Sequence, residues 1–162
     1  MSADYRGKNQ RKSAFIRVPF LPMFIDTSFH VRYAETDQMG IVHHSSYVVW
    51  MEEGRSTYMR AIGSDYADIE RSGYFLTVSE IHVRYLAPAH YGERITVHTR
   101  LEDVRSRTVT FGYEVVLTDT GQTLATGQSK HVCVDRSGRV ALIPARWRDI
   151  LAAAKTADLK GP

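Results

Sequence analysis

The sequence predicts an α+β domain in which an antiparallel sheet of five or six strands wraps around one long helix. Apolar and polar residues alternate in five separate stretches, and a single long stretch has helical spacing. No second helix is long enough to serve as a parallel crossover, so the strands must pair antiparallel. At 162 residues the chain has the size of one domain and can enclose a core without metal or disulfide staples.

The first strand is predicted at residues 28–33, where apolar and polar residues alternate. A helix follows that Ser45 or Ser46 can cap and that continues to about Ile62, with apolar residues at three- and four-residue steps. Gly54 in its middle costs about 1 kcal/mol relative to alanine. We therefore expect the helix backbone to approach the sheet closely at this position.

Four further strands are predicted after a short polar connection, at residues 75–86, 94–104, 107–118 and 122–134. A hairpin turn at residues 119–121 joins the last two strands, and Pro144 opens a short terminal helix. A sheet curled around one helix leaves its far face and two edges uncovered. Self-association is the natural way to cover them.

The folded domain is predicted at residues 27–155, between a flexible basic extension at 1–26 and a flexible tail at 156–162. The first residues lack the apolar core of a secretory signal, and no apolar run approaches the roughly 20 residues of a membrane span. We expect a cytoplasmic protein. Cys133 is the only cysteine, which excludes an internal disulfide, and its apolar surroundings predict an inert thiol.

Charge and motifs narrow the possible partners. The net charge of +3 is compatible with a phosphate-bearing ligand, although part of it lies in the predicted extension. The sequence has no phosphate-binding glycine loop and no stacked-aromatic signature of nucleic-acid binding. We therefore expect no nucleic-acid partner.

Asp37 is the first candidate for chemistry, because it follows a strand and precedes a helix. Acyl transfer needs a base or nucleophile on one side of a carbonyl and N–H donors on the other. A helix amino terminus offers such donors. Asp37 is also compatible with a plain turn cap, and Gly40 with a plain turn glycine as well as with close approach to a ligand.

His43 and His44 are adjacent, so on a first helical turn their side chains diverge by roughly 100° and do not clamp one metal together. We expect no metal site. Tyr33 can donate a phenolic hydrogen bond to the site of Asp37 or can fill the core. A basic patch for nucleotide phosphates, or simply solvated charge, is formed by Arg105, Arg107 and Lys130.

The stretch YAETDQMGIVHHSSY, followed by WMEEGR, resembles the 4-hydroxybenzoyl-CoA thioesterase family and its acyl-CoA thioesterase branch associated with the Tol-Pal system. The pattern of that branch is filled in register by Tyr33, Glu35, Thr36, Asp37, Gly40, His44 and Tyr47. The stretch VRYLAPAHYGE is similar to the family's strand followed by a proline and a glycine–acidic pair. The resemblance thus spans most of residues 27–135.

The resemblance implies a hotdog fold, with dimers that share a continuous sheet and often pair into tetramers. It implies hydrolysis of an acyl- or aroyl-CoA to free acid and CoA, with no metal and no redox cofactor. CoA itself counts as part of the substrate. Asp37 would be the general base or the nucleophile, His44 and Tyr33 would position substrate or water, and a backbone N–H near His44 would polarise the carbonyl. Substrate contacts would come from Gly40, Ile41, Val42, His43, Tyr47, Arg105, Arg107 and Lys130.

Two other functions fit the same residues. A hotdog hydratase would use Asp37 and His44 to add water across an enoyl-CoA double bond, although the spacing fits the thioesterase better. A non-catalytic acyl-CoA sensor would keep the pocket without turnover, and the retention of Asp37 argues against it. The one departure from the family pattern in this stretch is His43, where tyrosine or tryptophan is common.

Overall fold

A computed structural model describes residues 24–158 of the chain. The predicted extension and tail therefore lie largely outside the described residues. The elements are β1 (Ile25–His30), the 3-10 turn η1 (Tyr33–Glu35), α1 (His44–Ala61), α2 (Tyr66–Arg71), β2 (Tyr74–Tyr85), β3 (Arg94–Val104), β4 (Thr108–Leu117), β5 (Thr123–Asp135) and α3 (Ala145–Asp158).

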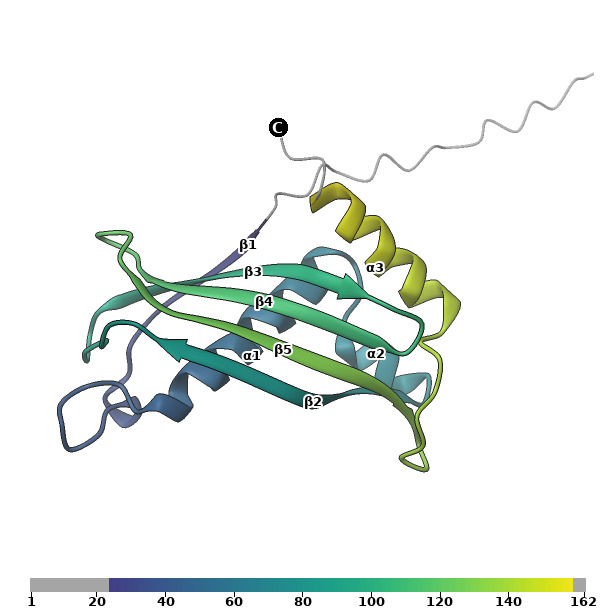
Figure 1. The fold of residues 1–162 in the computed structure, drawn as a ribbon, viewed down its shortest axis with the longest axis horizontal. Coiled ribbons are helices and arrows are strands. Elements are labelled where there is room, and N and C mark those ends of the chain that lie inside the picture. Colours follow the sequence, from purple (N-terminus) through teal and green to yellow (C-terminus); the bar gives the residue numbers. More distant parts are fainter. Residues whose placement is uncertain (1–23, 159–162) are drawn as a thin grey trace, which may run out of the picture.

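The strands form one antiparallel sheet in the order β1-β3-β4-β5-β2, so β1 and β2 are its edges (Figure 1). This confirms the predicted five-stranded antiparallel sheet. The predicted hairpin joins β4 and β5. Gly121 turns the chain there with a φ of +71°, and its N–H donates to the carbonyl of Leu117 over 2.8 Å.

Helix α1 packs against the sheet, and the two surfaces approach each other closely at Gly54. A Cβ at this position would stand 2.5 Å from Thr99 Oγ1 and 3.0 Å from Val97 Cγ1, both on β3. The expected close approach of the helix to the sheet is confirmed. On both sides of Gly54 the helix buries Trp50, Met51, Tyr58 and Met59 in the core.

The prediction of a single long helix is confirmed only in part. Helix α1, with 18 residues, takes the predicted place, but α3 has 14 residues and is not short. It packs against β3 near one end of the sheet and buries Trp147 and Leu151 in the same core (Figure 1). The predicted polar connection also contains α2, whose amino end is capped by Asp65 and whose Ile69 is buried.

The first strand begins and ends earlier than predicted. It pairs with β3 from Ile25, opposite Thr99, to His30, opposite Arg94, and Tyr33 lies in η1 instead. The pairing ends there because β3 itself starts at Arg94. The sheet therefore includes residues assigned to the extension, and α3 likewise continues into the predicted tail.

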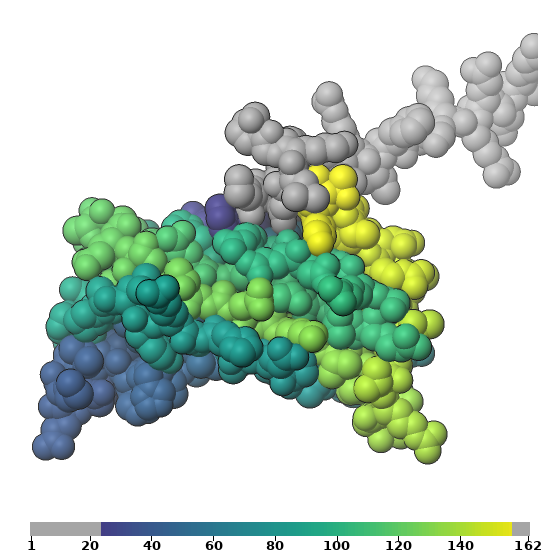
Figure 2. Space-filling model, viewed as in Figure 1, coloured from purple at the N-terminus to yellow at the C-terminus, as the bar shows by residue number. Residues whose placement is uncertain are grey.

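The molecule is elongated, with a projection at each end. In Figure 2 the loop between β1 and α1 protrudes at one end and the hairpin after β5 at the other. Within residues 24–158, none of the helices combines the length and the apolar character needed to cross a bilayer.

Candidate active site

Asp37 lies in a tight turn between η1 and α1. Thr36 and Val42 form an isolated antiparallel bridge that closes the turn. Inside it, the Asp37 N–H donates to the carbonyl of Ile41, and the Gly40 N–H donates to the carbonyl of Asp37, each over 2.9 Å. Gly40 has a φ of +75°, which a residue with a Cβ adopts only with strain. The turn geometry therefore accounts for this glycine.

The two carboxylate oxygens of Asp37 have different surroundings. Oδ1 accepts a hydrogen bond from the Met39 N–H over 2.8 Å and so stabilises the turn. Oδ2 accepts none from any residue between 24 and 158. The side chain is half-buried. Asp37 thus serves as a turn anchor through one oxygen and leaves the other available for chemistry.

Helix α1 begins directly after this turn, and its cap is His43 rather than the predicted serines. His43 Nδ1 accepts from the Ser45 N–H at 3.3 Å and pairs with Ser45 Oγ at 2.8 Å, while the His43 carbonyl accepts from Ser46. The N–H of His44 has no acceptor in the described part of the chain. It lies at the amino end of an 18-residue helix, where the helix dipole favours negative charge.

The rings of His43 and His44 do not diverge as expected but lie in contact, with centroids 4.0 Å apart and planes tilted by 38°, because His43 is the helix cap and not a residue of the first turn. Over the described range 24–158, no three side chains of histidine, cysteine, aspartate or glutamate gather in a way that could hold a metal ion. Each histidine is exposed.

A pocket of about 480 Å³ opens beside the helix start. Five predicted site residues line it, and the end of β2 with the segment after it forms the opposite wall. The lining comprises Asp37, Met39, Ile41, Val42, His44, Tyr47, Tyr85, Leu86, Ala87 and Pro88.

Three other predicted residues do not line this pocket. Gly40 and His43 adjoin it in the chain as turn glycine and helix cap. Tyr33 is 77% exposed and packs edge-on against the ring of Tyr91, with ring centroids 5.7 Å apart. Within one protomer Tyr33 neither joins the site nor fills the core, because the chain has already left the sheet at η1.

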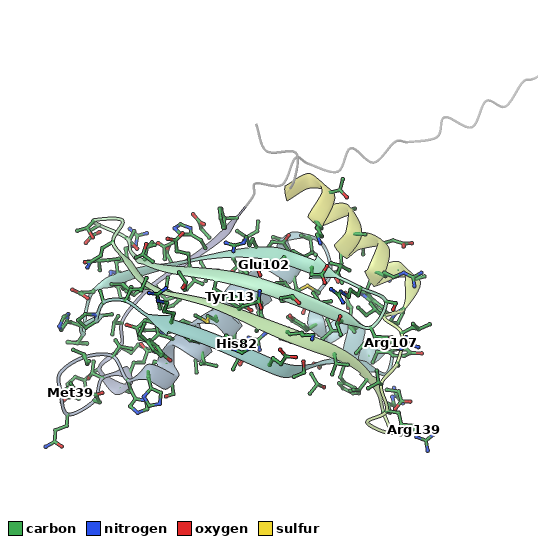
Figure 3. The ribbon with its side chains drawn as sticks, viewed as in Figure 1. Met39, His82, Glu102, Arg107, Tyr113 and Arg139 are labelled. Carbon is green, nitrogen blue, oxygen red and sulfur yellow. The ribbon has the colours of Figure 1, made fainter. Side chains whose placement is uncertain are left out.

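The predicted basic residues are not gathered around Asp37 in one protomer. Arg105 pairs with Asp103 at 2.7 Å, and Lys130 pairs with Glu80 at 3.1 Å across neighbouring strands. Figure 3 places Arg107 at the opposite end of the sheet from Met39, which lies in the Asp37 turn. Their contact with CoA phosphates stays a prediction.

Glu35 holds several hydrogen bonds around the Asp37 turn, a structural role that was not predicted from the sequence. Its buried carboxylate accepts hydrogen bonds from Arg32 Nη2 at 2.7 Å, from the Arg32 N–H at 2.8 Å and from Trp50 Nε1 at 2.9 Å. Its carbonyl accepts from the His43 N–H at 2.8 Å and from Ser46 Oγ at 3.3 Å. Glu35 therefore connects the two ends of the Asp37 turn to α1.

Burial by itself raises the pKa of Glu35, but the hydrogen bonds from Arg32 and Trp50, with the charge of Arg32, outweigh it and lower the pKa below its usual value. The carboxylate is therefore ionised at neutral pH.

Two tyrosines form the wall between α1 and β2. The ring of Tyr85 meets that of Tyr47 edge-on, with centroids 5.2 Å apart, and the Tyr85 hydroxyl donates to the carbonyl of His44 over 2.9 Å. Burial raises the pKa of both phenols, so both keep their protons at neutral pH. Tyr85 lies in the stretch that resembles the family, but only the fold brings the end of β2 to the start of α1.

Comparison with known proteins places this site in a family. Residues 31–154 match the sequence profile of the thioesterase-like superfamily. The chain belongs to this superfamily. Among curated relatives, the protein YneP of Bacillus subtilis, provisionally described as an acyl-CoA thioesterase, is 43% identical over 106 residues. The match covers 65% of this chain and 76% of YneP.

Solved structures of this thioesterase-like superfamily share its fold. TT1821 of Thermus thermophilus is 40% identical with a TM-score of 0.76, covering 80% of this chain and 98% of its own. DHNA-CoA thioesterase of Staphylococcus aureus is 25% identical with a TM-score of 0.81, covering 88% and 97%. The fold is thus the hotdog thioesterase fold that the sequence resemblance implied.

Proposed function

We propose that this protein hydrolyses the thioester bond of an acyl- or aroyl-CoA, releasing the free acid and CoA. The observation that carries the proposal is that Asp37 and His44 line one pocket. Among the described residues, neither Oδ2 of Asp37 nor the N–H of His44 has a hydrogen-bond partner. Relatives named as acyl-CoA and DHNA-CoA thioesterases support the same reaction. The narrower Tol-Pal branch is supported by the residue pattern around Asp37.

The chemistry follows from these groups by either of two routes. In one, Asp37 takes a proton from a water whose oxygen adds to the acyl carbon, the C–S bond then breaks, and Asp37 returns the proton to the departing thiolate. In the other, the carboxylate itself adds, the C–S bond breaks to give an acyl–aspartate anhydride, and water then cleaves the anhydride. In both, the oxyanion accepts a hydrogen bond from the His44 N–H, and the departing thiolate takes a proton. Neither route uses a metal or a redox cofactor.

The pocket favours an uncharged acyl group. Among the residues that the structure describes, its lining contains Asp37 as the only acidic residue and no lysine or arginine. An acyl group that carries a carboxylate would be repelled by Asp37 without a cation to offset the repulsion. Apolar contact for a chain or ring is available from Met39, Ile41, Val42, Leu86 and Pro88.

A second copy of the chain is the proposed partner. Strand β2 is an edge of the sheet, and its exposed apolar side chains Val78, Ile81 and Tyr85 form a stripe on one face of the strand. An edge of this kind is a template for strand pairing. The stripe runs into the pocket at Tyr85, so pairing through β2 would place the site at the interface and would allow basic residues of one copy to reach CoA bound to the other. A cytoplasmic location, where CoA thioesters are made and used, is part of the same proposal.

The proposal is tested with purified full-length protein and a panel of CoA thioesters: octanoyl, benzoyl, crotonyl and succinyl. Thiol release and enoyl absorbance are followed in the same samples. We expect thiol release from the uncharged substrates and the slowest release from succinyl-CoA. Loss of enoyl absorbance without thiol would indicate the hydratase instead, and binding without either change would indicate a sensor.

A further inference from the structure

Tyr85 makes an interaction that the fold of α1 does not need. The carbonyl groups that lack a helical partner are those of the last turn, whereas a carbonyl in the first turn already accepts from the N–H four residues later. The carbonyl of His44 is in the first turn of α1, yet it also accepts from the Tyr85 hydroxyl at 2.9 Å. This extra bond joins the edge strand to the helix start.

The ring of Tyr85 is held on its other side by Tyr47. The two rings meet edge-on, and both line the pocket that contains Asp37. Tyr85 is nevertheless 46% exposed, so burial of its ring contributes less than it would in the core. Its hydroxyl and its ring together fix one orientation of the first turn of α1 relative to β2.

We propose that Tyr85 is a positioning residue that fixes the amino end of α1, and with it the N–H of His44, relative to the Asp37 carboxylate. This inference rests on the proposed thioesterase activity. The His44 N–H is useful only if it points to the place where the oxyanion forms, about 3 Å away. Tyr85 does not donate to the oxyanion itself, because its hydroxyl is bonded to the His44 carbonyl.

A second effect of the bond acts through the peptide group. The His44 carbonyl and the Ser45 N–H belong to the same peptide unit, and a donor on the oxygen polarises the N–H. Ser45 holds the cap through its long bond to His43 Nδ1. The Tyr85 hydroxyl therefore stabilises the capped helix start from the strand side.

The test is Tyr85→Phe, which removes the hydroxyl and keeps the ring against Tyr47. The matched control is Tyr74→Phe at the other end of β2, because no residue from 24 to 158 shares a hydrogen bond with the Tyr74 hydroxyl. Two quantities are measured: kcat and KM for a thioester, and hydrogen exchange of the backbone amides of residues 45–47. Exchange requires no substrate.

We expect Tyr85→Phe to lower kcat about tenfold with KM nearly unchanged, since a small displacement of an oxyanion donor affects the transition state most. Exchange at residues 45–47 should be faster in Tyr85→Phe, and Tyr74→Phe should change neither quantity. Wild-type kcat and exchange in Tyr85→Phe would overturn the inference, as would faster exchange without loss of kcat. A raised KM with unchanged kcat would make Tyr85 a substrate contact instead. Absence of thiol release from the wild-type protein would overturn the proposed function. Exchange in Tyr85→Phe at the wild-type rate would overturn only the proposal that Tyr85 fixes the amino end of α1.

Discussion

At the scale of single residues, the carboxylates of Asp37 and Glu35 have different surroundings and different roles in the turn. Asp37 is anchored through Oδ1 to the Met39 N–H, so its second oxygen is presented in a fixed direction. Glu35, two residues earlier, holds the turn in place through Arg32 and Trp50. The proposed catalytic carboxylate and a structural carboxylate therefore lie two residues apart, and their surroundings differ.

Glu35→Gln should lower the free energy of unfolding at pH 7 by about 1–3 kcal/mol, because a buried charge-assisted acceptor is lost. The folded pKa of Glu35 is below its unfolded value of about 4.3. Its carboxylate therefore stabilises the fold above that value, and the stabilisation disappears as the pH falls through the folded pKa. The difference between wild type and variant should shrink on acidification below about pH 4.3.

Urea unfolding at pH 7, 5 and 3.5 measures this difference. Glu53→Gln is the control, because Glu53 is an exposed residue of α1 that pairs with Arg60 at 3.1 Å, and exposed pairs contribute little. A difference that stays constant across the three pH values would contradict the role of the Glu35 charge.

At the scale of elements, the contact between α1 and β3 determines where the helix start lies. Gly54 is ten positions after His44 on the same helix, and its missing side chain lets the helix rest on Thr99 and Val97. Any group added there pushes the helix from the sheet. Such a shift would reach the pocket, since a helix moves as a rigid unit.

Gly54→Ala gains about 1 kcal/mol of helix propensity but places a methyl group 2.5 Å from Thr99 Oγ1. We expect net destabilisation of about 1–3 kcal/mol, because overpacking in a close-packed contact costs more than the propensity gain. The effect should be smaller in a Thr99→Ala background, where the nearest atom is absent. Equal effects in both backgrounds, measured by urea unfolding, would show that the close approach is not the cause.

At the scale of the whole molecule, the edge strand β2 leaves apolar side chains exposed in a single copy. Its apolar stripe reaches the pocket at Tyr85, and none of the predicted ligands of the CoA phosphates lines the pocket in the same protomer. The proposed second copy would resolve both features. On this proposal the quaternary structure determines whether the substrate site is complete.

Light scattering should give the wild type a mass of at least twice 18.4 kDa. Ile81→Lys should yield monomers, because it places a charge in the middle of the exposed stripe of β2. Val140→Lys is the control, since Val140 is 60% exposed in the hairpin after β5, away from that edge. A monomeric wild type, or equal dissociation by both variants, would contradict pairing through β2.

Sequence patterns predicted the features that depend on neighbouring residues. Alternation located four of the strands to within one residue, and the glycine in the helical stretch predicted the contact of Gly54 with the sheet. The start of β1 could not be read, because its extent is set by pairing with β3. The polar composition of residues 66–71 concealed α2.

The sequence predicted those pocket residues that lie close together in the chain. It did not predict contacts between residues that are far apart in the chain. Asp37, His44 and Tyr47 were found because they lie within eleven consecutive residues. Glu35 contacts Trp50 fifteen positions away, and Tyr85 contacts His44 forty-one positions away. No local pattern connects such pairs, so only the fold assigns them a role.

The central claim is that the open oxygen of Asp37 acts on the thioester. Asp37→Asn keeps the oxygen that anchors the turn and removes the charge. Asp65→Asn is the matched control, because Asp65 likewise accepts a backbone hydrogen bond, from the Ala67 N–H at 3.1 Å, but lies outside the pocket. We predict that Asp37→Asn lowers kcat for thiol release by about a thousandfold or more at nearly unchanged stability. Asp65→Asn should remain active. An Asp37→Asn enzyme that retains most of the wild-type kcat would contradict the account.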